Sequence, residues 1–177
     1  MSIFDSQCVI KVCPVNTKGV MGAGLAKKFK ENYPKEEDGL LNCGMEDIYK
    51  DFCLNGECLG WDGVKRFLPG DVVIKPYPYP PKKGDTWKYI ALFATKDHWR
   101  DRSKIEWIES GLMQLHHHLK SKDAIANGKT SIAVPALGCG LGGLKYSHVK
   151  PLIVKYLGFL GDNLEIYDVT GNLDTRR

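Results

Sequence analysis

Two glycine-rich clusters, each placed between a β-branched run and a helical pattern, constrain the fold of this sequence more than any other feature. The first cluster lies in "NTKGVMGAGLAKKF", residues 16–29, directly after the β-branched run at 8–15. The second, "GCGLGG" at 138–143, directly follows "KTSIAVPAL" at 129–137. Strand patterns that alternate with helical patterns predict βαβ units, in which a mainly parallel sheet is covered by helices.

The other predicted elements continue this alternation. We expect strands at 8–15 (ending at Pro14), 71–75, 86–95, 129–137 and 163–169, and helices at 24–33, 45–54, 103–120 and 147–159. The helix at 103–120 is the clearest, because Ile105, Ile108, Leu112, Leu115 and Leu119 recur at helical spacing.

Two serines are placed where helix caps are expected. Ser103, with Glu106 three positions later, predicts a capping box. Ser147 is expected to cap the following helix, with Pro151 in its first turn.

Length and composition predict one ordinary globular domain. The 177 residues form a single domain, 1–177, with an irregular insertion at about 35–66, and 43% of them are hydrophobic. The formal charge of +4 favours an anionic partner only mildly. No apolar run approaches the ~20 residues that cross a bilayer, and "MSIFDSQCVIKVC" lacks a secretion-signal pattern. We therefore expect a cytoplasmic, monomeric protein without a membrane partner.

The six cysteines predict reduced thiols rather than a metal centre. Cys8 and Cys13 lie in a strand pattern and Cys139 in a loop, where a reduced cysteine acts as a small hydrophobic residue. Cys43, Cys53 and Cys58 cluster, but their spacing is not that of a standard zinc site and no fourth ligand is obvious. Zinc binding by these three stays an open alternative.

The glycine clusters stand where an open α/β sheet binds ligands, beyond the carboxyl ends of its strands. Backbone N–H groups and a helix N-terminus form an anion site there, and two facing loops suit a diphosphate. The Walker pattern is absent, and GxGxxG is only partly met, because Gly22 and Gly24 fit but Lys27 takes the third place. Simple turn formation is the structural alternative.

Three stretches resemble the macrodomains, which bind ADP-ribose. They are "IFDSQCVIKVCPVNTKGVMGAGLAKKF", "VPALGCGLGGL" and "IYDV", and the resemblance extends over nearly the whole chain except about 35–66. It implies a three-layer α/β/α fold with a mixed, mainly parallel central sheet. The segment "LFATKDHWRDRSKIEWIESGL" is similar to the DarG-like branch, whose members remove ADP-ribose from thymidine in DNA.

The resemblance implies roles for residues around both glycine clusters. Asn16 would contact the distal ribose, Ile3 the adenine through its backbone, and Lys96 would attack the anomeric carbon of that ribose. The remaining ligand-binding residues would be Gly22, Ala23, Gly24, Leu25, Thr95, Gly138, Cys139, Gly140, Leu141 and Gly142. A turn asparagine and a solvated lysine are the structural alternatives.

Four further residues are candidates for the site. His98 could shuttle a proton, Trp99 or Tyr146 could stack on a base, and Asp168 ends the last predicted strand near the expected adenosine half. The histidines at 116–118 are consecutive on a helix and point about 100° apart, so they cannot converge on one metal.

Two positions depart from relatives within the family. Many macrodomains carry an adenine-binding aspartate where this chain has Ser2. The human terminal ADP-ribose–glutamate hydrolase pairs its lysine with an aspartate where this chain has Gly142, which rules out that pair here.

The sequence therefore predicts a hydrolase of glycosidic ADP-ribose links that needs no cofactor and acts on DNA bases, preferably thymidine, rather than on protein. A cognate ADP-ribosyltransferase toxin is the expected partner. A non-catalytic binder of ADP-ribose or a related NAD-derived nucleotide is one alternative, and a phosphatase of ADP-ribose 1″-phosphate is another.

Overall fold

A central five-stranded sheet organises the computed structural model, which describes residues 1–33, 45–55, 67–76, 86, 88–126 and 130–175. The strand order is β2-β3-β1-β4-β5. The strands are β1 (Ile10–Asn16), β2 (Val72–Pro76), β3 (Tyr89–Lys96), β4 (Ile132–Val134) and β5 (Leu164–Ile166). Strands β3, β1, β4 and β5 are parallel, and only β2 runs antiparallel, along β3. The predicted mixed, mainly parallel sheet is confirmed.

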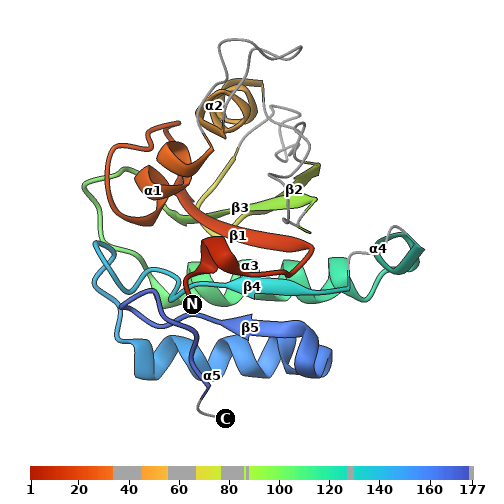
Figure 1. Ribbon diagram of the computed structural model, residues 1–177. Coiled ribbons are helices and arrows are strands. Elements are labelled where there is room, and N and C mark those ends of the chain that lie inside the picture. Colours follow the sequence, from red (N-terminus) through yellow and green to blue (C-terminus); the bar gives the residue numbers. More distant parts are fainter. Residues whose placement is uncertain (34–44, 56–66, 77–85, 87, 127–129, 176–177) are drawn as a thin grey trace.

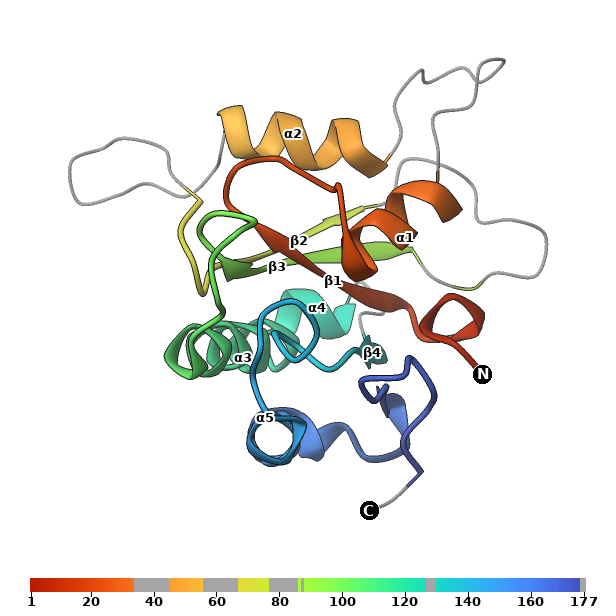
Figure 2. The same ribbon diagram turned by 90° about the vertical axis from the view of Figure 1, so that its left-hand side faces the viewer.

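Helices cover both faces of this sheet, so the predicted three layers are confirmed (Figures 1 and 2). Helices α1 (Gly24–Asn32) and α2 (Met45–Asn55) lie on one face. Helices α3 (Ile105–Leu119) and α5 (Tyr146–Leu157) lie side by side on the other. The short elements are η1 (Ile3–Asp5), α4 (Lys122–Ala126) and η2 (Gly158–Asn163). None of the helices in the described ranges is long and apolar enough to cross a membrane.

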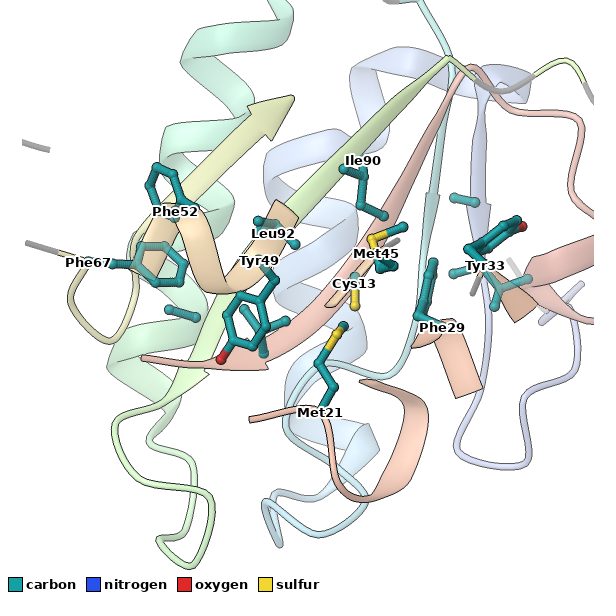
Figure 3. Packing of buried hydrophobic residues seen from close by; sticks show 14 of the residues in the cluster. Cys13, Met21, Phe29, Tyr33, Met45, Tyr49, Phe52, Phe67, Ile90 and Leu92 are labelled. Atoms are coloured by element: carbon teal, nitrogen blue, oxygen red, sulfur yellow. The ribbon is translucent and has the colours of Figure 1, made fainter. Parts of the chain in front are cut away.

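The sheet separates two hydrophobic cores, and strand β1 contributes to both because its side chains alternate in direction. Cys13 and Val15 pack with Phe29, Tyr33 and Tyr49 under α1 and α2 (Figure 3). On the opposite face, Ile10 and Val12 belong to the core under α3 and α5, whose buried helical positions are Ile108, Leu112, Leu115, Leu119, Val149, Ile153 and Leu157. The predicted apolar face of α3 is thereby confirmed, with Ile105 only partly buried.

Strand β1 continues through Pro14, where the sequence predicted its end. Strand β4 pairs with β1 only at Ile10 and Lys11, so the segment around Pro14 lacks a paired neighbour on that side. A proline without an N–H group is tolerated where a strand has a free edge. Strands β4 and β5 are also shorter than predicted, with three residues each.

Both predicted serine caps are wrong. Helix α3 begins after Lys104, whose side chain makes no capping hydrogen bond, and Ser103 is instead buried beneath the second glycine cluster. Helix α5 begins after Lys145, so Ser147 lies inside its first turn and Pro151 lies in the helix interior.

The segment 35–66 contains the short helix that the sequence predicted there. Helix α2 matches the helical pattern at 45–54, and its residues Met45, Tyr49 and Phe52 are buried. The rest of the segment 35–66 lies outside the described residues. Cys43 and Cys58 lie there too, so zinc binding by these two with Cys53 stays an open alternative. Cys8 and Cys13 are buried free thiols. The described ranges contain no cluster of three His, Cys, Asp or Glu side chains that would hold a metal.

Candidate functional site

A cleft of about 680 Å³ lies where the loops that follow strands β1, β3, β4 and β5 meet. These loops gather at the carboxyl ends of the parallel strands, on the left of Figure 1 and facing the viewer in Figure 2. Most of the predicted site residues line the cleft, namely Ile3, Asn16, Gly22, Ala23, Gly24, Leu25, Thr95, Lys96, Trp99, Gly138, Gly140, Leu141, Gly142 and Asp168. The fold therefore brings both glycine clusters and the predicted catalytic lysine to one site.

The first glycine loop leads directly into helix α1. Ala23 is the N-cap residue, in an extended conformation and without a side-chain capping bond. Gly24 opens the helix with φ of 59°, a conformation that side chains disfavour. The first turn thus presents uncapped N–H groups, together with the positive end of the helix dipole, to the cleft.

The second glycine loop is held by its own carbonyl oxygens. The N–H groups of Leu144, Gly143 and Ser103 donate to the carbonyls of Gly138, Gly140 and Gly142, each at 3.0 Å. Within the described part of the chain, no acceptor pairs with the N–H groups of Gly140, Leu141 and Gly142.

Close packing explains why this loop needs glycine. A Cβ atom at Gly142 would lie 2.3 Å from both the Gly138 carbonyl oxygen and Ser103 Oγ. At Gly140, by contrast, a Cβ would meet nothing within 4 Å. Gly142 is therefore required by the fold itself, whereas Gly140 leaves open space beside the cleft.

The two loops approach each other across the cleft. A Cβ atom at Gly24 would lie 3.5 Å from Leu141 Cδ1, so the tip of the second loop reaches the start of α1. Unpaired N–H groups on both sides of a narrow cleft form an anion site, and two such sides fit a diphosphate better than a single phosphate.

The side chain of Asn16 is buried at the cleft wall and orders the first loop. Its Oδ1 accepts from the N–H of Lys18 and lies 2.8 Å from the hydroxyl of Tyr49. Its Nδ2 donates to the carbonyl of Val20 at 2.7 Å. An amide nitrogen carries two hydrogens, so one N–H remains to meet a ligand hydroxyl.

Lys96 is the last residue of β3, and its amine reaches the second glycine loop. Nζ donates a 3.0 Å hydrogen bond to the Leu141 carbonyl oxygen. Partial burial lowers the pKa of the Lys96 amine, and the charge of Asp101 opposes this shift. A lysine with a lowered pKa beside a cleft has the chemistry of a nucleophile or a proton acceptor.

Residues 97–101 follow Lys96 and contact the turn after strand β1. Asp97 pairs with Lys18 at 2.8 Å and accepts from the Thr17 hydroxyl, which ties this segment to the first loop. His98 stacks on Trp99 with ring centroids 3.7 Å apart, and its Nδ1 accepts the N–H of Arg100. Trp99 lines the cleft and is 44% exposed, whereas His98 is not among the lining residues.

Three other predicted residues make contacts inside the protein. The Asp168 carboxylate accepts from the backbone N–H groups of Thr170 and Asn172, so it shapes the turn that lines the cleft. The hydroxyl of Tyr146 donates to Asp174, and Tyr146 does not line the cleft. Cys139 also lies outside the lining; burial raises the pKa of its thiol to about 11.

Sequence reasoning missed several residues of this site. Lys28, Tyr167 and Thr170 line the cleft, and Tyr49 contacts Asn16 from helix α2. Lys28 follows the first glycine cluster by one helical turn, which is a signal that could have placed it near an anion. The other three carry no local signal, because their positions depend on the packing of distant segments.

No family model matches the chain, but individual known proteins resemble it. The chain is 36% identical, over 175 residues, to a DNA ADP-ribosyl transferase–DNA ADP-ribosyl glycohydrolase fusion protein of Thermosipho africanus. The match covers 93% of this chain and 39% of that protein. The chain thus spans about two fifths of the length of the curated relatives that it matches.

Two solved structures resemble the model over nearly the whole chain. The macrodomain of Mycobacterium tuberculosis DarG is 30% identical with a TM-score of 0.72, and the match covers 94% of this chain and 93% of that one. Thermosipho africanus DarTG in complex with ADP-ribose is 31% identical with a TM-score of 0.75, covering 97% of this chain and 41% of that one.

Proposed function

The chain belongs to the macrodomain family, in the branch of the DarG macrodomains, and we propose that it hydrolyses the link between ADP-ribose and a DNA base, preferably thymidine. One observation carries the proposal. The amine of Lys96 is held at 3.0 Å from the second glycine loop, inside a cleft whose two sides present unpaired backbone N–H groups. Diphosphate binding at these loops would bring the distal ribose within reach of that amine.

The proposed reaction uses Lys96 as the nucleophile. Its unprotonated Nζ attacks the anomeric carbon of the distal ribose, the bond from that carbon to the base breaks, and the base leaves after taking up a proton. Water then attacks the same carbon, the bond to Nζ breaks, and free ADP-ribose departs. Asn16 would orient the ribose through its remaining N–H, and Gly22 and Gly140 would let the backbone approach the phosphates.

Two features favour DNA as the carrier of the ADP-ribose. Trp99 presents exposed aromatic surface at the cleft, and Arg100 and Arg102, both exposed, follow it. An exposed aromatic ring at the cleft, with guanidinium groups close to it in the sequence, suits an unstacked base and its phosphates. The names of the relatives also specify DNA ADP-ribosyl glycohydrolases.

A single-turnover assay tests the proposal. The protein is incubated with a single-stranded oligonucleotide that carries one ADP-ribosylated thymidine, and free ADP-ribose and unmodified oligonucleotide are quantified. We expect both products in equal amounts. An oligonucleotide that stays modified, while a known glycohydrolase cleaves it, would refute the DNA assignment.

Three further measurements separate the alternatives. A non-catalytic module would bind ADP-ribose in calorimetry yet leave every ADP-ribosylated substrate intact. A phosphatase would release inorganic phosphate from ADP-ribose 1″-phosphate. Cleavage of ADP-ribosylated protein, but not of ADP-ribosylated DNA, would show that the substrate is ADP-ribose linked to a protein side chain.

The relatives also support a partner. Because one relative is a transferase–glycohydrolase fusion, we infer that this chain acts against an ADP-ribosyltransferase toxin that modifies the same bases, as an antitoxin in the cytoplasm. Light scattering would test the monomeric state that belongs to this proposal.

A further inference from the structure

We propose that helix α2 is a structural support of the ribose site and that Tyr49 is the residue through which it positions Asn16. This inference rests on the proposed function, because it assigns a role in ADP-ribose binding to a helix that lies outside the glycine loops. Figure 3 shows Tyr49, a residue of α2, among the buried hydrophobic residues on this face of the sheet.

The hydroxyl of Tyr49 lies at the centre of the turn that follows β1. It is 2.8 Å from Asn16 Oδ1, within hydrogen-bond distance of the Asn16 carbonyl oxygen, and accepts the N–H of Gly19 at 3.1 Å. The Tyr49 side chain is fully buried, so these partners cannot be replaced by bulk water. A single phenol thus fixes both the side chain of Asn16 and the backbone three residues later.

The backbone of this turn is also packed against α2. Gly19 has φ of 75°, and a Cβ atom there would lie 3.5 Å from Lys50 Cγ and 3.8 Å from Cys53 Cβ. The turn therefore runs directly over the surface of α2 and can keep its shape only while the helix stays in place.

A second set of contacts joins α2 to helix α1, which follows the first glycine loop. Glu46 pairs with Lys30 of α1 at 2.6 Å, and the N–H of Met45 donates to the carbonyl of Tyr33, the C-cap of α1. Glu46 also pairs at 3.2 Å with Lys50, one turn later in α2 itself. Helix α2 consequently holds both the turn before the glycines and the helix after them, and the loop between these points is the one that lines the cleft.

This arrangement makes Tyr49 a positioning residue. With the Tyr49 contact in place, the Asn16 amide can expose only its remaining N–H to a ligand. Loss of the phenol hydroxyl would leave Oδ1 short of one partner and let the amide rotate, so a ribose hydroxyl would meet a disordered donor. The expected defect lies in ligand affinity and not only in stability.

The test compares Tyr49→Phe with Tyr156→Phe. Tyr156 is a matched control, because its hydroxyl also makes a side-chain hydrogen bond, to Glu109, but on helix α5 and outside the cleft lining. Calorimetry with ADP-ribose, well below the melting temperature, should show about tenfold weaker binding for Tyr49→Phe and wild-type affinity for Tyr156→Phe. In an Asn16→Ala background, Tyr49→Phe should change the affinity by less than about twofold.

Amide hydrogen exchange of the wild-type protein tests the inference without any ligand. The Gly19 amide should exchange slowly although it lies in a turn, because its acceptor is buried. Fast exchange at Gly19, or wild-type ADP-ribose affinity in Tyr49→Phe, would overturn the role of Tyr49 and leave the proposed function intact. A wild-type protein that neither binds ADP-ribose nor cleaves ADP-ribosylated DNA, but protects Gly19, would instead refute the proposed function.

Discussion

The Nζ atom of Lys96 donates a hydrogen bond of 3.0 Å to the carbonyl oxygen of Leu141, which joins the end of strand β3 to the tip of the second glycine loop. Leu141 in turn reaches across the cleft to the start of α1 at Gly24. The amine is therefore fixed relative to both loops. A diphosphate bound by those loops would define where its ribose stands with respect to the amine.

Replacing the amine should separate chemistry from binding. In Lys96→Ala, we expect turnover of ADP-ribosylated DNA to fall at least about a hundredfold, because the nucleophile is lost, while ADP-ribose affinity stays within about threefold. Single-turnover kinetics and calorimetry measure the two quantities.

Lys155→Ala is the matched control for that variant, since Lys155 also donates a 3.0 Å hydrogen bond, to Glu109, from the exposed surface of α5. It should turn over normally. Normal turnover in Lys96→Ala itself would exclude the lysine mechanism.

The pH dependence of turnover should report the lowered pKa of Lys96. Only the unprotonated amine attacks, so the rate should rise with pH through a midpoint below the ordinary lysine value of 10.5. Asp101 raises the pKa of this amine, so Asp101→Asn should move the midpoint to lower pH. A pH–rate profile of each protein measures the shift, and Glu109→Gln, which removes a carboxylate that pairs with Lys155, should leave the profile unchanged.

Much of the fold follows from local pattern. Helix α3 carries apolar residues at helical spacing, and four of them, Ile108, Leu112, Leu115 and Leu119, are buried. The glycine clusters predicted both loops correctly, because Gly24 and Gly138 adopt positive φ where the chain must turn sharply. These features depend only on residues that are near each other in the sequence.

The features that the sequence did not predict depend on packing between distant segments. Ser103 was predicted as a cap, yet Gly138 and Gly142, more than thirty residues later, cover it. Tyr49 lies thirty-three residues after Asn16, and a tyrosine on an apolar helix face gives no sign of which polar group its hydroxyl reaches. Local sequence rules identify a turn or a helix but not the distant segment that packs on it.

Alanine substitutions at two glycines should affect protein stability and ligand affinity separately. In Gly142→Ala the new Cβ collides with the Gly138 carbonyl, so we expect a loss of about 2 kcal/mol and a fall in melting temperature of roughly 4–8 °C. In Gly140→Ala the Cβ enters open space, so the melting temperature should stay within about 1 °C. ADP-ribose affinity should nevertheless fall about tenfold in Gly140→Ala, because the Cβ keeps the phosphates from the backbone. Unchanged affinity in that variant would place the diphosphate elsewhere.

Removing the hydroxyl of Ser103 should not destabilise the protein. Ser103 is 6% exposed, and its Oγ is a buried polar atom without a hydrogen-bond partner in the described part of the chain. An unpaired buried hydroxyl costs free energy, so Ser103→Ala should be neutral or more stable by up to about 1 kcal/mol. Chemical denaturation measures this change. A loss of more than about 1 kcal/mol would mean that the hydroxyl has a partner after all.

Removing the Trp99 ring should weaken binding of ADP-ribosylated DNA but not of free ADP-ribose. Its ring lines the cleft, is 44% exposed and is fixed by stacking on His98, so it offers a rigid surface beside Lys96. In Trp99→Ala we expect the KM for ADP-ribosylated single-stranded DNA to rise about tenfold, since stacking on one base contributes roughly 1–3 kcal/mol. Free ADP-ribose should bind as before, because the glycine loops and Asn16 are untouched.

Trp107→Ala is the control, as Trp107 lies on α3 and is not among the cleft residues. Equal losses for DNA and for free ADP-ribose in Trp99→Ala would instead place this ring against the nucleotide itself, and no loss for either would remove it from substrate recognition.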